Sequence, residues 1–130
     1  MTRAELRALI RLTVGSATRW SDATLDQWIA AAVRLYGAHF GEAAVPAADE
    51  DPVDVPETHL EALTAYVDFA AAREMQMAAA NESDGSSITV SQLGDQARRA
   101  WNRYKDVMDQ LVAMSVGATT LVKWDVAQVS

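Results

Sequence analysis

Arginines at helical spacing are the side chains of this 130-residue chain that most clearly invite a chemical role. Arg3, Arg7 and Arg11 recur every four residues, so on a helix they form a basic stripe that can hold carboxylates. Between Arg34 and Arg73 the chain has no Lys or Arg and eight acidic residues. Because opposite charges across an interface determine its register, we expect the stripe to form a subunit interface with the acidic region of a neighbouring copy.

A second group of arginines is interleaved with aromatic residues. Arg98, Arg99 and Arg103 stand close to Trp101 and Tyr104. This combination is typical of surfaces that contact a nucleic-acid backbone. Three aspartates on the same predicted helix offset the positive charge, so we favour a subunit interface or a solvated face for these arginines. A small helical regulatory or nucleic-acid-binding module that uses them is the alternative.

The acidic stretch from Asp49 to Asp54 has oxygen ligands at alternate positions, as calcium sites do. It lacks the central Gly and the closing Glu of an EF-hand loop and contains Pro52 instead. A solvated run of charge is therefore the better interpretation. We expect neither a metal nor a cofactor.

Candidates for catalysis are few. The chain has no Cys and two His, so thiol chemistry and Cys-ligated zinc are excluded. His39 and His59 have no partner at metal-ligand spacing, and the carboxylates of Glu57 and Glu61 stand one helical turn apart without any sign of a cleft. The sequence contains no phosphate-binding Gly-rich loop and no nucleophile motif. We expect a protein that is not an enzyme.

Composition limits the remaining classes. The chain carries 11 Lys and Arg against 18 Asp and Glu, a net charge of −7, which disfavours diffuse binding to nucleic acid. It has no apolar stretch long enough to span a membrane, and its first residues lack the apolar segment of a signal peptide. We expect a soluble single domain made in the cytoplasm, without membrane contact.

Hydrophobic periodicity indicates four helices. Thr2 and Glu5 form a capping-box pattern that begins the first, and Ser21 is the expected N-cap of the second, which Gly41 ends. A proline-containing acidic loop follows. We expect the remaining helices at 56–80 and, after Ser91 as N-cap, at 92–114.

The predicted third helix has two faces that can pack. One is a stripe of large apolar residues that includes Leu63, and the other is rich in Ala, so this helix should lie between neighbours. Trp28, Leu63 and Tyr104 each occupy the middle of an apolar stripe. We expect these three residues in one core.

The segment after Gly117 changes character. Residues 119–129 are rich in β-branched side chains and lack a helical period. We therefore expect two parts: an all-α bundle of four helices at residues 1–114 and an extended C-terminal arm at residues 115–130. An isolated strand is not stable in water, so such an arm should order itself on a partner through its apolar side chains, Leu121, Val122, Trp124 and Val126.

The order of these elements resembles a known family. A short first helix is followed by Trp20-Ser21-Asp22-Ala23-Thr24-Leu25, which opens a second helix ending in Tyr36. After a loop come a long Ala-rich third helix, a polar turn, and a fourth helix that contains Tyr104-Lys105-Asp106-Val107-Met108. Over residues 2–114 this pattern resembles the head-to-tail adaptor (connector) proteins of long-tailed bacteriophages.

The resemblance implies a structural protein of the virion neck, made in the cytoplasm of a bacterial host. Its copies would form a ring, commonly a dodecamer, below the portal protein, and would meet stopper or tail-terminator proteins on the other side. Genome DNA would pass through the channel without specific binding, and the C-terminal arm would reach the portal.

Overall fold

The computed structural model of the chain describes residues 1–14, 19–81 and 87–129, and the side chains of residues 1–14, 19–80 and 90–114. Its elements, in chain order, are α1 (Arg3–Val14), α2 (Asp22–Phe40), the short 3-10 helix η1 (Glu57–His59), α3 (Leu60–Asn81) and α4 (Ser87–Val129). Within these ranges there is no β-strand, and Thr2 and Pro52 form an isolated bridge. The predicted all-α class is confirmed.

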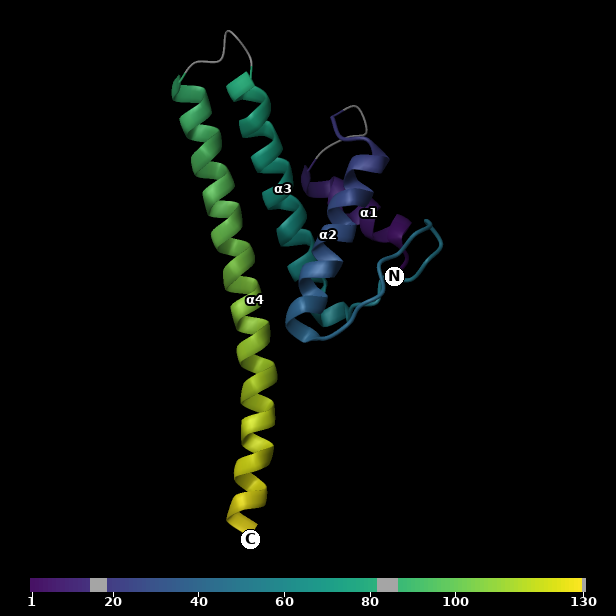
Figure 1. The fold of residues 1–130 in the computed structure, drawn as a ribbon, viewed down its shortest axis with the longest axis vertical. Coiled ribbons are helices and arrows are strands. Elements are labelled where there is room, and N and C mark those ends of the chain that lie inside the picture. Colours follow the sequence, from purple (N-terminus) through teal and green to yellow (C-terminus); the bar gives the residue numbers. More distant parts are fainter. Residues whose placement is uncertain (15–18, 82–86, 130) are drawn as a thin grey trace.

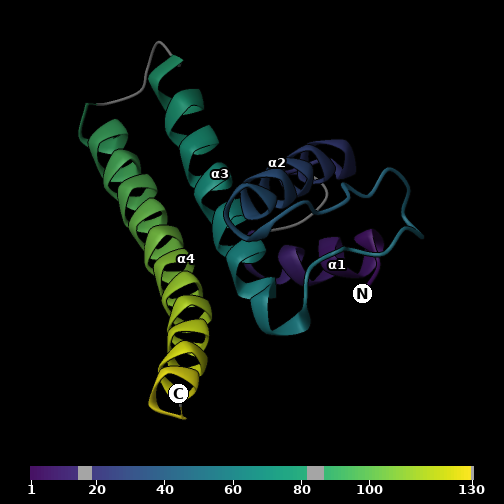
Figure 2. The same cartoon turned by 60° about the horizontal axis from the view of Figure 1, so that its bottom comes forward.

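Helix α3 lies between the two halves of the fold. Helices α1 and α2 pack on one side of it, and α4 runs antiparallel to it along the other side (Figure 1 and Figure 2). The loop of residues 41–56 begins at the end of α2 and returns to η1 beside α3, and its middle extends away from α4 (Figure 1).

The larger core lies where α1, α2 and α3 meet. Leu63 and Val67 of α3 are 1% and 0% exposed and contact apolar residues of both other helices. The remaining buried members come from α1, α2 and the acidic loop: Leu6, Ile10, Leu25, Ile29, Ala32, Val33, Tyr36, Val53 and Val55. Two valines of a highly acidic loop thus belong to the hydrophobic core.

A second core lies between α3 and α4. Ala62 and Ala65 of α3 are buried against Tyr104, Val107 and Met108 of α4. The short alanine side chains let the larger side chains of α4 approach the α3 backbone closely. The expectation that α3 packs on two faces is confirmed.

The prediction of one core around Trp28, Leu63 and Tyr104 is wrong. Leu63 belongs to the first core and Tyr104 to the second, while Trp28 is half-buried at the edge of the first. The reason is that α3 separates the two cores. Tyr66 and Phe40 contact both and connect them.

The predicted start of the last helix is wrong. Helix α4 (Ser87–Val129) begins before the expected N-cap Ser91. The β-branched residues at 88–90 cost a helix only about 0.5 kcal/mol each, which is too little to keep them out of it. The extended arm expected at residues 115–130 stays a prediction. The side chains of residues 115–130, and with them Leu121 and Trp124, lie outside the described part.

The acidic loop is attached to the start of α1. The backbone N–H of Arg3 donates to the carbonyl of Asp51 over 3.0 Å. The Asp51 carboxylate in turn accepts from the backbone N–H groups of Ala47 and Ala48, each over 2.9 Å. These bonds hold the loop in a defined conformation although it has no regular secondary structure.

The first prediction concerns the buried face of α3. Leu63→Ala should lower the free energy of unfolding by about 2–5 kcal/mol, because it removes a fully buried side chain and leaves a cavity. Leu12→Ala is the matched control, since Leu12 is 81% exposed. Denaturant unfolding measures both variants, and equal effects would contradict the assignment of Leu63 to the core.

The second prediction concerns helix starts. Ser21 Oγ accepts from the backbone N–H of Thr24 over 3.2 Å, so Ser21→Ala should cost about 1 kcal/mol of unfolding free energy. Ser91 lies inside α4 and is exposed, so Ser91→Ala should leave stability unchanged or slightly raised. A cost for Ser91→Ala equal to that of Ser21→Ala would mean that α4 begins at Ser91.

Candidate functional site

The Trp20-Ser21-Asp22 sequence forms the corner between α1 and α2. The indole Nε1 of Trp20 donates to the carbonyl of Val14 at the end of α1, over 3.0 Å. Arg11 donates to the Trp20 carbonyl over 2.9 Å and pairs with the carboxylate of Asp22. The motif that carries the family resemblance therefore closes one helix, opens the next and locks the angle between them.

Arginines of α1 form a cluster of ion pairs with three aspartates. Arg7 Nη1 lies 2.8 Å from Asp26 Oδ1 and 2.9 Å from Asp49 Oδ1, and Arg3 Nη2 lies 2.9 Å from the same Asp49 oxygen. Arg7 Nε also lies 3.4 Å from Asp22. The hydrogen bond from Arg7, and after it the one from Arg3, lowers the pKa of Asp49 well below its ordinary value. Asp49 and then Asp26 raise the pKa of Arg7, so it stays charged.

This cluster changes the interpretation of the basic stripe. Arg3, Arg7 and Arg11 do pair with acidic residues, but those residues belong to the same chain, including Asp49 of the acidic loop. The three arginine side chains are only 13–19% exposed. Their charge thus joins α1, α2 and the loop, and a role for them between subunits stays a prediction.

Some of the arginines of α4 also form ion pairs. Arg98 pairs with Asp95 of its own helix over 2.7 Å, and Arg103 reaches Asp68 of α3 over 3.0 Å. For Arg99 no ion pair is found among the described side chains. The sequence groups these arginines, whereas the structure separates them: Arg98 faces a groove, and Arg103 holds α4 to α3.

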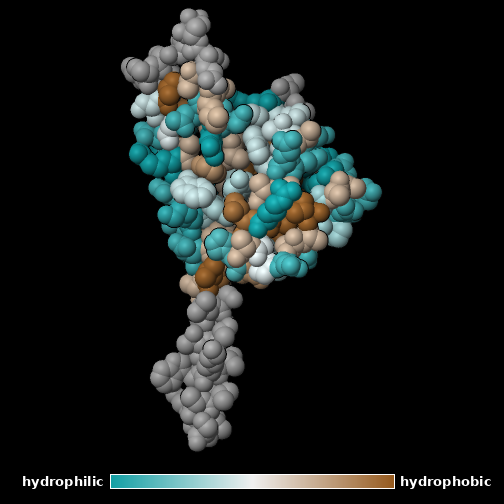
Figure 3. Space-filling model, viewed as in Figure 1, coloured by the Kyte–Doolittle hydropathy of each residue, from teal (hydrophilic) through white to brown (hydrophobic). Residues whose placement is uncertain are grey.

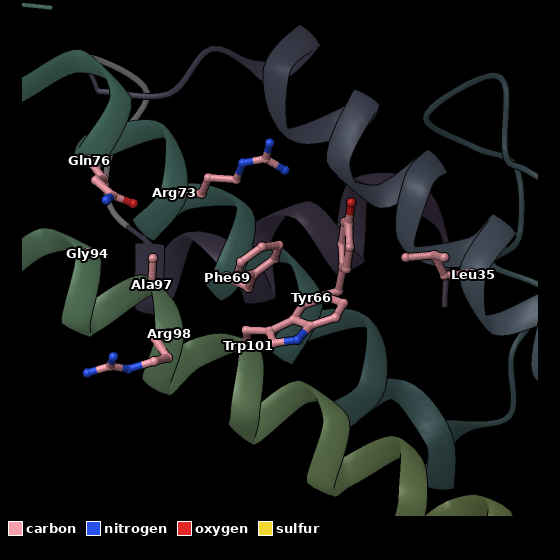
Figure 4. A pocket seen from close by; sticks show the side chains of 9 residues that line it. All are labelled: Leu35, Tyr66, Phe69, Arg73, Gln76, Gly94, Ala97, Arg98 and Trp101. Atoms are coloured by element: carbon pink, nitrogen blue, oxygen red, sulfur yellow. The ribbon is translucent and has the colours of Figure 1, made fainter. Parts of the chain in front are cut away.

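The groove lies between α2, α3 and α4 and has a volume of about 610 Å³ (Figure 4). Aromatic rings form its floor, and two arginines stand at its margin. Its lining residues are Leu35, Tyr66, Phe69, Arg73, Gln76, Gly94, Ala97, Arg98 and Trp101. The space-filling view shows apolar residues in separate patches among polar ones, without one large apolar area on this face (Figure 3).

The aromatic floor is a connected set of rings. The ring centroids of Phe69 and Trp101 are 4.9 Å apart, and those of Tyr66 and Tyr104 are 5.5 Å apart. Burial, and then the neighbouring Tyr66, raises the pKa of Tyr104 above its ordinary value. Trp101 is 37% exposed, so a large aromatic face stays open to a ligand or partner.

The groove is not predicted from the sequence. At Gly94 the two helices that line the groove approach closely, since a Cβ atom there would come within 2.8 Å of the Gln76 amide nitrogen. A usable signal was present, because Gly94 and Trp101 are seven residues apart on one helix, as are Phe69 and Gln76 on another. What the sequence could not show was that these two faces meet.

Each of the two histidines contacts a polar atom of α2. The Tyr36 hydroxyl lies 2.7 Å from His59 Nδ1, and burial, with Asp54 adding to it, raises the pKa of Tyr36. His39 Nδ1 lies 3.0 Å from the Leu35 carbonyl. Among the described residues, no group of three or more His, Asp or Glu side chains is placed to hold a metal ion.

The side chains predicted to contact the portal lie outside the described residues. The side chains of Leu121, Val122, Trp124 and Val126 all fall within residues 115–130. Their role stays a prediction. As for membranes, no helix in the described ranges is both long and apolar enough to cross one.

Comparisons with protein-family models, with curated proteins and with solved structures find no match for this chain. The geometry of the chain and the resemblance in its sequence are therefore what bears on function.

The third prediction is a pH dependence caused by Asp49. Its folded pKa is lowered, so its contribution to stability is present above the ordinary carboxyl pKa of about 3.9 and is lost as the pH falls below it. Asp49→Asn, which has no proton to gain, should flatten the fall of the thermal midpoint between about pH 5 and pH 2.

Glu50→Gln is the matched control, because Glu50 is the exposed neighbour and no ion pair is found for it in the described part of the chain. It should follow the wild-type curve. Parallel curves for the wild type and Asp49→Asn would contradict a lowered pKa at Asp49.

Proposed function

We propose that this chain is a structural adaptor of the phage neck, which forms a ring below the portal, joins the capsid to the tail and lets DNA pass. The observation that carries the proposal is the corner at Trp20-Ser21-Asp22. These residues bear the resemblance to phage head-to-tail adaptors: Trp20 and Asp22 contact α1, and Ser21 caps the start of α2. A motif that holds two helices in a fixed arrangement suits a structural protein.

The architecture supports assembly. Helices α3 and α4 form a long antiparallel pair, which gives a small subunit an extended side for contact with neighbours (Figure 1). The groove beside them exposes Trp101, and large aromatic side chains are enriched at protein interfaces. A net charge of −7 suits a channel wall that DNA must pass without binding.

The contacts of the α4 arginines argue against the nucleic-acid-binding alternative. Arg103 pairs with Asp68 of α3 over 3.0 Å, so contact of Arg103 with phosphate would first require this link between α4 and α3 to break. Salt discriminates the two functions: phosphate contacts weaken steeply as ionic strength rises, whereas apolar contacts between subunits do not.

Within this proposal, residues 115–130 form the part that meets the portal protein, through Leu121, Val122, Trp124 and Val126. Stopper or tail-terminator proteins would bind the opposite end of the ring. The ring, commonly a dodecamer in the family resembled, would take its place in the virion after synthesis in the bacterial cytoplasm.

The fourth prediction tests this assignment. Deletion of residues 118–130 should leave the helical domain folded, with an unchanged far-UV signal per helical residue and cooperative unfolding, but should abolish attachment to portal-bearing capsids. Co-sedimentation with such capsids measures attachment. Full-length chain that does not co-sediment with capsids, or whose binding to duplex DNA falls steeply with salt, would contradict the adaptor function.

A truncated chain that attaches as well as the full-length chain would remove the portal contact from this segment. Loss of cooperative unfolding on truncation would instead place residues 118–130 in the core. The two outcomes are distinguishable because folding and attachment are measured on the same sample.

A further inference from the structure

Two unlike surfaces lie apart on the molecule. One is the loop of residues 41–56 (Figure 1 and Figure 2) with the adjoining Glu57, and the other is the aromatic groove beside α4 (Figure 4). Helices α2 and α3 separate them. A contact between the two surfaces would therefore join different copies of the chain and not parts of one copy.

The first surface, here called the acidic edge, presents carboxylates to solvent. Glu42, Glu50 and Glu57 are exposed, and within residues 1–14, 19–80 and 90–114 no ion pair is found for them. The arginines of α1 hold the loop through Asp49, and these glutamates are not among their ion-pair partners. Pro52 and Pro56 are exposed on the same edge.

The groove has the complementary chemistry. Tyr66, Phe69 and Trp101 provide flat aromatic faces, and proline-containing segments commonly dock on aromatic-lined grooves. Arg73 and Arg98 stand at the margin and are exposed. The pair between Arg98 and Asp95 is itself exposed, so it contributes little and can be exchanged for a contact with another carboxylate.

We propose that the acidic edge of one copy docks into the aromatic groove of the next, with its glutamates facing Arg73 and Arg98. This inference rests on the proposed function, because it names the contact by which the ring would be built. A contact between two different surfaces is heterologous, and repetition of it around a closing rotation produces a ring.

Charge disfavours the two symmetric ways of covering these surfaces. A groove facing another groove would bring four arginines into one contact, and two acidic edges would bring glutamates together. Like charges across an interface cost several kcal/mol. The head-to-tail contact is the arrangement in which both surfaces meet opposite charge.

The test reverses the charges on each side separately and then together. The groove variant carries Arg73→Glu and Arg98→Glu, and the edge variant carries Glu50→Arg and Glu57→Arg. Sedimentation at increasing protein concentration measures the mass of each full-length variant. Each variant alone should need at least about tenfold more protein than the wild type for half-assembly.

The variant with all four changes restores opposite charge across the contact and has the wild-type net charge of −7, so it should assemble like the wild type. Lys105→Glu with Asn102→Asp and Gln110→Glu is the matched control, because these three residues are exposed on α4, do not line the groove and together change the net charge as much as the groove variant does. Unchanged assembly is expected for the control. Thermal unfolding verifies that every variant is folded.

Groove and edge variants that assemble like the wild type would overturn the inference. So would a control that weakens assembly as much as the groove variant, or a fourfold variant that is not restored. Wild-type chain that stays monomeric at its solubility limit also overturns it. None of these results removes the adaptor function, which is decided separately by attachment to portal-bearing capsids.

Discussion

Helix α3 must bury two unlike faces at once, and the rest of the fold depends on this constraint. Leu63 and Val67 need the apolar surface of α1 and α2, while Ala62 and Ala65 need a neighbour that approaches closely. These faces lie on different sides of one helix, so no single partner can cover both. The result is a central helix with α1 and α2 on one side and α4 on the other, and the aromatic groove lies where these two halves meet.

The charged side chains form two groups: some pair with each other within the chain, and others are exposed at its surface. Arg3 and Arg7 neutralise Asp26 and Asp49 across the contact between α1, α2 and the loop, where side chains are partly shielded from water. The carboxylates that remain at the surface give the chain an acidic edge and most of its net charge. A single chain thus carries an acidic surface on one side and an aromatic surface with arginines on another, which is the condition for head-to-tail assembly.

Trp101 of α4 contributes to the groove and contacts the rings of Phe69 and Tyr104. The Trp101 ring is tilted by 54° against that of Phe69 and the residue keeps 37% of its surface open, so the aromatic floor is ordered before a partner arrives. Order before binding reduces the entropy that association must overcome. A docking partner would complete a surface that the fold has already built.

The sequence by itself determined the local structure. The capping box at Thr2 and Glu5, the N-cap at Ser21 and the helix end at Gly41 are all as expected, because each depends on hydrogen bonds or a backbone angle within three or four residues. Local preference was too weak to predict where α4 begins, since β-branched residues cost a helix little.

Only the tertiary structure decided which charges meet and where the groove lies. Asp49 is 42 residues from Arg7, and Gly94 is 18 residues from Gln76. Pairing over such separations depends on how whole helices pack, and the periodicity of one helix shows which face is apolar but not which neighbour covers it. The sequence therefore identified the arginines and aromatics as candidates, and the packing of α3 between its neighbours assigned each of them a partner.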